Sequence, residues 1–115
     1  MYLLDIRPFP KERPRVTRSG TFMSDRYTSA RDTLSFHLRA LHLPCIPAPE
    51  PVALILHFTY SNQRTADLDN LAGGFMDAAN SILYTDDKQV VSLTCTKQVT
   101  GTDSISFTVA PLPSH

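Results

Sequence analysis

Apolar and polar residues alternate along four segments of the chain, which is the pattern of β-strands. These segments are residues 2–6, 52–60, 89–97 and 103–109. Residues 52–60 are largely apolar on both faces, which predicts a central strand of a sheet. Two other segments have helical spacing. One follows Ser24, a good N-cap, and the other runs from about residue 67 to residue 83.

The order of these elements predicts an α+β domain with a mixed four-stranded sheet and two helices packed on one face. We expect the whole chain, residues 1–115, to form one domain, since it is long enough for one modest core. Between the first strand and the first helix, residues 7–22 are rich in proline and arginine, and prolines exclude a helix there. A small hairpin turning at Ser19 and Gly20 fits this segment. Residues from about 111 to 115 are expected to be a frayed tail.

Composition excludes several classes of protein. The chain is 42% hydrophobic and 19% charged, as in ordinary globular proteins, and no apolar run approaches the roughly 20 residues of a membrane helix. Cys45 and Cys95 have neither redox nor metal-binding spacing. We therefore expect a cytoplasmic protein with reduced thiols, with Cys95 in the core.

Charge is unevenly distributed, although the net charge is zero. Residues 7–39 hold eight basic side chains against three acidic ones, whereas residues 67–87 hold five aspartates and no Lys or Arg. A basic arm beside an acidic pocket suits a metal-dependent enzyme that acts on a phosphodiester, because the arm can hold the DNA backbone. A loop solvated by its own charges is the alternative for the arm.

Carboxylates that lie so densely in sequence repel one another unless a cation or a basic partner offsets them. Asp67 or Asp69 would cap the second helix, and Asp87 would return after it. Mg²⁺ prefers oxygen ligands and needs only a few carboxylates. Any one of these residues could be a simple cap or a solvated turn residue. Taken together, Asp67, Asp69 and Asp87 favour a metal site.

The same stretch resembles the RusA-type Holliday junction resolvases. The resemblance rests on Asp-Leu-Asp-Asn-Leu at residues 67–71, Phe-Met-Asp-Ala at residues 75–78, Asp-Asp-Lys-Gln-Val-Val at residues 86–91, and Lys97. That family consists of small homodimeric Mg²⁺-dependent endonucleases, many carried by prophages, so the resemblance implies an analogous homodimer. It also implies that Asp67, Asp69 and Asp87 are the metal ligands, with Mn²⁺ as a substitute ion. Asp86 could be a fourth carboxylate or an outer partner.

The resemblance also assigns DNA contact to the arm. Basic residues with Phe9 and Phe22 interleaved among them fit phosphate contact. Arg64 is the one cation in the loop before the acidic helix. The expected DNA-binding residues are Lys11, Arg13, Arg15, Arg18 and Arg64. Lys97 is a candidate catalytic residue near the aspartates, and a surface salt bridge is its alternative role.

One position departs from the family pattern. The family has a catalytically important lysine four residues after its second aspartate, where this chain has Gly73, followed by Gly74. Arg64, Lys88 or Lys97 could replace that charge. Each glycine costs a helix interior about 1 kcal/mol relative to alanine. We expect an offsetting role in close packing, including packing across a dimer interface, or in clearance for a ligand.

These observations predict a Mg²⁺-dependent, structure-selective endonuclease that resolves four-way DNA junctions in recombination and repair. A Holliday junction has two-fold symmetry, so paired cuts require two active sites and a homodimer. The first alternative is a junction-binding protein of the same fold whose nuclease activity is weak or lost with the lysine. The second is a structural protein whose aspartates only cap and solvate.

Overall fold

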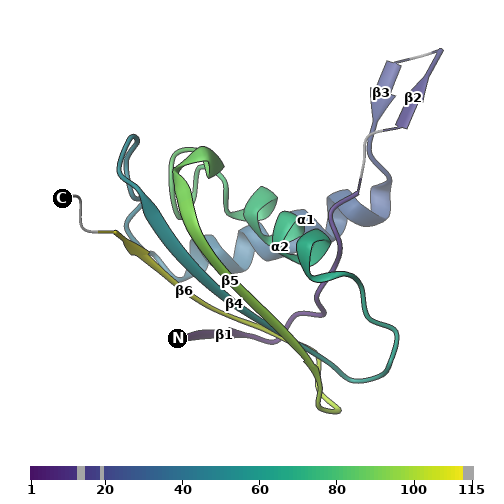
Figure 1. Ribbon diagram of the computed structural model, residues 1–115. Helices are drawn as coiled ribbons and strands as arrows, with labels where there is room; N and C mark the ends of the chain where they lie inside the picture. Colours follow the sequence, from purple (N-terminus) through teal and green to yellow (C-terminus); the bar gives the residue numbers. More distant parts are fainter. Residues whose placement is uncertain (13–14, 19, 113–115) are drawn as a thin grey trace.

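In the computed structural model, which describes residues 1–12, 15–18 and 20–112, a four-stranded sheet packs against two helices (Figure 1). The sheet order is β1-β6-β4-β5. Its strands are β1 (Tyr2–Leu4), β4 (Val52–Tyr60), β5 (Val90–Val99) and β6 (Ser104–Pro111). Strand β5 is parallel to β4, whereas β6 is antiparallel to both β4 and β1. The predicted mixed sheet is therefore confirmed.

Both helices lie on the same side of the sheet (Figure 1). Helix α1 spans Asp25–Ala40 and α2 spans Leu68–Ala79. Ser24 caps α1 as predicted, since its side chain accepts a hydrogen bond from the Tyr27 N–H. The helices bury Leu34 and Leu38 of α1, and Leu71 and Phe75 of α2, against the sheet. The α+β class with two helices on one face is confirmed.

Strand β4 supplies the centre of the core. Every second residue from Val52 to Tyr60 is at most 2% exposed, and these five side chains face the helices. The turn after β5 crosses the end of β4, where the N–H groups of Thr100 and Gly101 both donate to the Tyr60 carbonyl oxygen. Strands β5 and β6, although consecutive in sequence, therefore flank β4 and do not pair with each other.

Helix α2 ends at Ala79, earlier than the predicted end near residue 83. The N–H groups of Ile82 and Leu83 both donate to the Ala79 carbonyl oxygen, which turns the chain. This turn buries Leu83 and Tyr84 completely, and that packing outweighs continuation of the helical pattern. A short 3₁₀ helix, η1 (Asp87–Gln89), then precedes β5.

The arm contains the predicted hairpin, formed by β2 (Arg15–Thr17) and β3 (Gly20–Phe22). Gly20 has a φ of 126°, a backbone conformation that favours glycine. At the other end of the chain, β6 continues to Pro111, and the Leu112 N–H donates to the Pro51 carbonyl oxygen. The chain expected to fray from about residue 111 is thus held as far as residue 112, and residues 113–115 lie outside the described part.

The two cysteines differ in their surroundings. Cys95 is half-buried on β5 beside the core, and burial raises the pKa of its thiol. Cys45 is exposed. Within the described residues, no helix is long and apolar enough to cross a membrane.

Candidate active site

Two exposed carboxylates mark the start of α2. Asp67 is the N-cap residue, yet its side chain makes no capping hydrogen bond. Asp69 lies in the first turn and accepts a hydrogen bond from the Asn70 N–H at 3.0 Å. The helix dipole favours negative charge at this end. Both side chains are exposed to solvent.

Lys97 reaches the same place from β5. Its Nζ donates to the carbonyl oxygen of Ala66 at 2.8 Å and to Thr65 Oγ1 at 3.3 Å. Ala66 immediately precedes Asp67, so the ammonium group lies at the entrance to α2. The sheet achieves this by placing Lys97 opposite Phe58, near the end of β4 from which the loop to α2 departs. No surface salt bridge of Lys97 is found among the described residues.

Asp86 serves mainly as a helix cap. Its side chain accepts the Lys88 N–H at 2.9 Å, and the Gln89 side chain accepts the Asp86 N–H at 2.9 Å. Together these bonds form a capping box around η1. The hydrogen bond from the Lys88 N–H lowers the pKa of Asp86. Asp86 is therefore engaged locally, and the exposed Asp87 lies directly beside it.

Asp87 lies close to Tyr84, which contacts the C-terminal half of α2. Burial and then the charges of Asp87 and Asp77 raise the pKa of Tyr84, whose hydroxyl donates to the Met76 carbonyl oxygen at 3.3 Å. Asp87 is thus within electrostatic reach of the helix turn that holds Met76. In the described part of the chain, no three His, Cys, Asp or Glu side chains are grouped so as to hold one metal ion.

The donor chemistry at the start of α2 nevertheless fits Mg²⁺. This ion is usually held by one or two protein carboxylates, while water and substrate phosphate supply the remaining oxygens. Asp67 and Asp69 provide two carboxylates of that kind on one helical turn. These two residues, by themselves, satisfy the minimal protein contribution to such a site.

Asp77, the remaining aspartate of the acidic stretch, has a structural role. Its carboxylate accepts a hydrogen bond from the Tyr27 hydroxyl at 2.7 Å and lies 3.7 Å from the Arg31 guanidinium. Burial and then this hydrogen bond raise the pKa of Tyr27. Asp77 therefore joins α2 to α1, away from the helix start.

The arm crosses α2 at the glycine pair. The Lys11 N–H donates to the Asn70 carbonyl oxygen at 2.8 Å, and the Glu12 carboxylate accepts the N–H of Ser24 at 3.0 Å. A β-carbon on Gly73 would lie 3.2 Å from the Lys11 side chain, and one on Gly74 would lie 2.6 Å from a backbone oxygen of the arm. The glycines therefore serve close packing, and this packing occurs within one chain.

A cavity of about 680 Å³ opens between the arm, α1 and the loop before α2. Four basic residues and one acid line it, namely Arg7, Lys11, Arg26, Arg64 and Glu12. Ala66 also lines the cavity, so it reaches the residue before Asp67. The fold thereby brings Lys11 and Arg64, two of the predicted DNA-binding residues, to one basic cleft.

Of the remaining predicted DNA-binding residues, Arg15 and Arg18 belong to the hairpin. Arg18 is exposed, Arg13 lies outside the described residues, and only the backbone of Arg15 is described. Arg7 and Arg26 also line the cleft, although neither was among the residues that the sequence predicted to bind DNA. Both belong to the basic excess of residues 7–39, and the position of Arg26 just after the Ser24 cap was the available signal.

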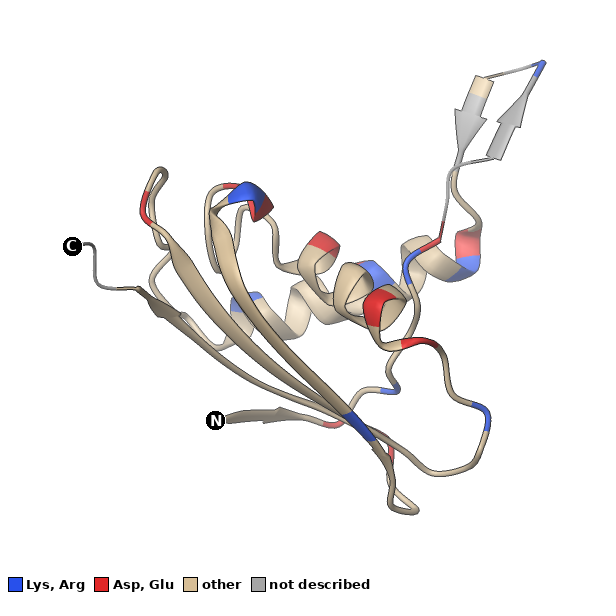
Figure 2. Cartoon of the chain, viewed as in Figure 1, with Lys and Arg blue, Asp and Glu red and all other residues tan. Residues whose placement is uncertain are grey.

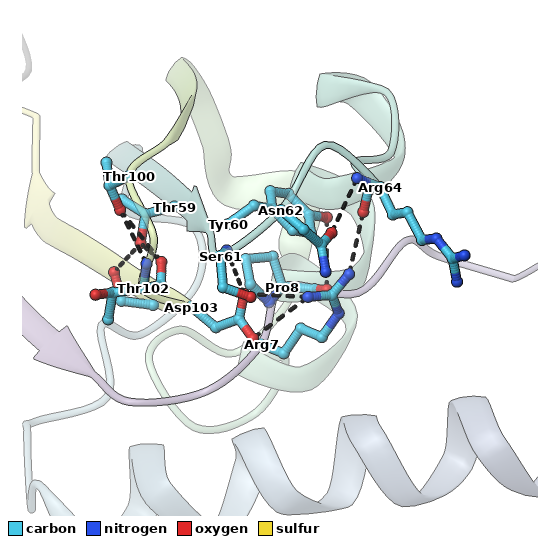
Figure 3. Close-up of polar contacts among 11 residues, drawn as sticks. Arg7, Pro8, Thr59, Tyr60, Ser61, Asn62, Arg64, Thr100, Thr102 and Asp103 are labelled. Atoms are coloured by element: carbon cyan, nitrogen blue, oxygen red, sulfur yellow. Dashed lines mark hydrogen bonds and ion pairs between the residues drawn. The ribbon is translucent and has the colours of Figure 1, made fainter.

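Arg7 fixes the loop that carries Arg64 (Figure 3). Its guanidinium donates to Asp103 Oδ1 at 3.1 Å and to the Arg64 carbonyl oxygen at 3.1 Å. Asp103 also accepts the Ser61 N–H at 2.8 Å, and this bond, with Arg7, lowers the pKa of Asp103. The guanidinium also lies 5.1 Å from the centre of the Tyr60 ring. Arg7 is therefore a structural clamp at the edge of the cleft.

The charged residues gather outside the sheet. In Figure 2 the visible strands are almost uniformly uncharged, whereas basic and acidic positions lie on the helices, the arm and the connecting loops. The sheet is thus a scaffold, and the charged surface lies along the helices and the arm.

Comparison with known proteins gives one clear result. A family model described as Endodeoxyribonuclease RusA matches residues 5–110. That match covers both helices, the arm, β4, β5 and nearly all of β6, and it begins just after β1. A search of curated proteins found no match.

Proposed function

The chain belongs to the RusA endodeoxyribonuclease family, and from this premise we propose that it is a Mg²⁺-dependent, structure-selective endonuclease that resolves Holliday junctions. Members of this family act on branched DNA, and its resolvases generally depend on a divalent metal. For this particular chain, we propose the magnesium dependence, the site residues and the homodimer.

The observation that carries the proposal is the juxtaposition at the start of α2. Two exposed carboxylates, Asp67 and Asp69, lie beside the Lys97 ammonium group and at the end of a basic cleft. A divalent ion held there would polarise the scissile phosphate and lower the pKa of the attacking water. Lys97 holds the loop that leads into Asp67 and adds positive charge next to the carboxylates.

Asp87 is the third carboxylate of the proposed site. It is exposed and lies on the connection between α2 and β5, with its neighbour Asp86 occupied as a helix cap. Of these two adjacent carboxylates, Asp87 is therefore the one available as a metal ligand. Its family position supports the same assignment.

The basic residues of the arm and the cleft would hold the DNA backbone. Lys11, Arg26 and Arg64 line a cavity that ends beside the carboxylates, and Arg18 lies on the adjoining hairpin. Arg13 and Arg15 complete the proposed set. Such contacts to phosphate position the duplex without reading its sequence, as structure-selective cleavage requires. Paired cuts in a two-fold junction require two such sites, and we propose that a homodimer supplies them.

Gly73 favours a second candidate, which is a junction-binding protein that cleaves weakly or not at all. The residue that faces the same way as Asp69, one turn further along α2, carries no charge in this chain. A missing charge-stabilising group lowers the cleavage rate by a factor on the order of 100 to 1,000 without preventing DNA binding.

Incubation of the full chain with a labelled four-way junction separates the candidates. Mg²⁺, Mn²⁺ and chelator are compared, and Asp69→Asn serves as the inactive control. Paired nicks that require the metal support the resolvase. Salt-sensitive binding to the junction without nicks supports the binding protein. Equal affinity for the junction and for a linear duplex, without nicks, contradicts both.

A further inference from the structure

The Lys11 side chain lies along the face of α2 that Gly73 leaves bare. A β-carbon on Gly73 would lie 3.2 Å from both Cβ and Cδ of Lys11. The Lys11 N–H also donates to the Asn70 carbonyl oxygen at 2.8 Å, which fixes the backbone of the arm on the first turn of α2. The aliphatic part of Lys11 thus occupies the space that a side chain at position 73 would use.

This space leads towards the carboxylates. Gly73 follows Asp69 by four residues, so the two positions lie on the same face of α2. Side chains on a helix point back towards its N-terminus, so the space over Gly73 extends in the direction of Asp69. The ammonium group of Lys11 is only two bonds beyond Cδ. It therefore stays close to the part of α2 that contains Gly73.

Two other cations near the site have partners within the described part of the chain, whereas the guanidinium groups of Arg26 and Arg64, which also line the cleft, make no hydrogen bond or ion pair with a described residue. Lys97 donates to Ala66 and Thr65, and Arg7 is bound to Asp103 and to the Arg64 backbone. Lys11 is exposed, and its ammonium group makes no hydrogen bond or ion pair with a described residue. It also lines the basic cleft. Among the cations that line the cleft, Lys11 is the one whose side chain packs against Gly73, one turn from Asp69.

We propose that Lys11 is a catalytic residue. From the arm, it places its ammonium group where the ammonium group of a lysine at position 73 of α2 would lie. The group stabilises the negative charge that develops on the scissile phosphate. This assignment rests on the proposed nuclease function. This assignment also explains why position 73 is a glycine. The absence of a side chain there makes room for a cation from another segment.

The test is single-turnover cleavage of a four-way junction at saturating protein. Lys11→Met keeps most of the aliphatic packing and removes the charge, and we expect the cleavage rate to fall on the order of 100-fold. Lys11→Ala should behave in the same way. The double variant Lys11→Ala with Gly73→Lys should recover much of the rate, because removal of the Lys11 side chain frees the space for a lysine on α2. Arg39→Ala, a distant exposed cation, is the control and should cleave normally.

A second measurement does not depend on cleavage. Removal of a positive charge beside Asp69 should tighten Mg²⁺ binding severalfold in Lys11→Met without DNA, measured by calorimetry, and should leave it unchanged in Arg39→Ala. An unchanged cleavage rate in Lys11→Met at saturating protein overturns the assignment, as does a double variant no faster than Lys11→Ala. A wild-type chain that never nicks refutes the proposed nuclease function. In that case, Mg²⁺ affinity that is the same in wild type and Lys11→Met also refutes the placement of Lys11.

Discussion

The backbone carbonyl oxygen of Phe9 lies 2.6 Å from the position that a β-carbon would take on Gly74. Side chains essentially never approach so closely, so only glycine fits at this position. The Phe9 ring lies over the same residue and makes an edge contact with Tyr27, with 5.9 Å between the ring centres. The arm is thereby joined to both helices at a point that requires the absence of a side chain.

The two glycines should respond differently to alanine. In Gly74→Ala the new methyl group meets backbone atoms, and we expect a loss of about 1–3 kcal/mol in the free energy of unfolding. In Gly73→Ala the new methyl group lies 3.2 Å from Cβ and Cδ of Lys11, which need to shift only by a few tenths of an ångström, so the gain in helix propensity of up to about 1 kcal/mol should offset most of the cost. Urea denaturation of both variants measures this difference. Equal destabilisation would contradict the account of the contact.

The proposed metal ligands should be individually essential for cleavage. We expect Asp67→Asn, Asp69→Asn and Asp87→Asn to remain folded, because all three side chains are exposed, and to lose junction cleavage. Asp25→Asn, which alters an exposed aspartate in the first turn of α1, is the matched control and should cleave normally. Normal cleavage by Asp87→Asn alone would remove that residue from the ligand set. Normal cleavage by all three variants would end the metal assignment.

Basic residues of the hairpin and of the cleft should contribute to DNA binding through phosphate contacts. Replacement of Arg13, Arg15 and Arg18 by alanine should weaken junction binding and flatten its salt dependence, because each lost contact releases about one counterion fewer. The double variant Arg26→Ala with Arg64→Ala, which removes two cations of the cleft, should weaken binding and flatten its salt dependence in a similar way. The slope of log affinity against log salt is the measurement. A slope unchanged by the triple replacement would indicate an arm that is merely solvated by its charges.

The Asp103 carboxylate, which accepts the Ser61 N–H and pairs with Arg7, should make stability depend on pH in the acidic range. The pKa of Asp103 is lowered in the folded chain, so its contribution is present above the unfolded pKa of about 3.9 and is lost as pH falls through the folded value. The melting temperature of wild type should therefore exceed that of Asp103→Asn at about pH 6, and the difference should shrink towards about pH 3. Asp5→Asn, another exposed aspartate, is the control. A constant difference across this range would contradict the linkage.

The local elements follow from the sequence alone. The alternation from Val52 to Tyr60 fixed both the span and the buried face of β4, since every second residue there is apolar and the pleat has a period of two. Ser24 fixed the start of α1, because its side chain can satisfy a helix N–H that has no partner in the helix. The acidic motif and its family resemblance identified the α2 region before any contact was known.

The tertiary structure decided which strands lie side by side and where α2 ends. Periodicity indicates which face of a strand is buried, yet it carries no information about which strand lies beside it, so the insertion of β4 between β5 and β6 could not be derived. The end of α2 at Ala79 was set by the burial of Leu83 and Tyr84.

The site depends in the same way on contacts that are remote in sequence. Lys97 reaches Ala66 because β5 is parallel to β4, and Arg7 reaches Asp103 across the whole length of the chain. The sequence alone shows that position 73 has no charged side chain. The fold decided that Lys11 fills the space above it, because only packing of the arm on α2 brings the two residues together.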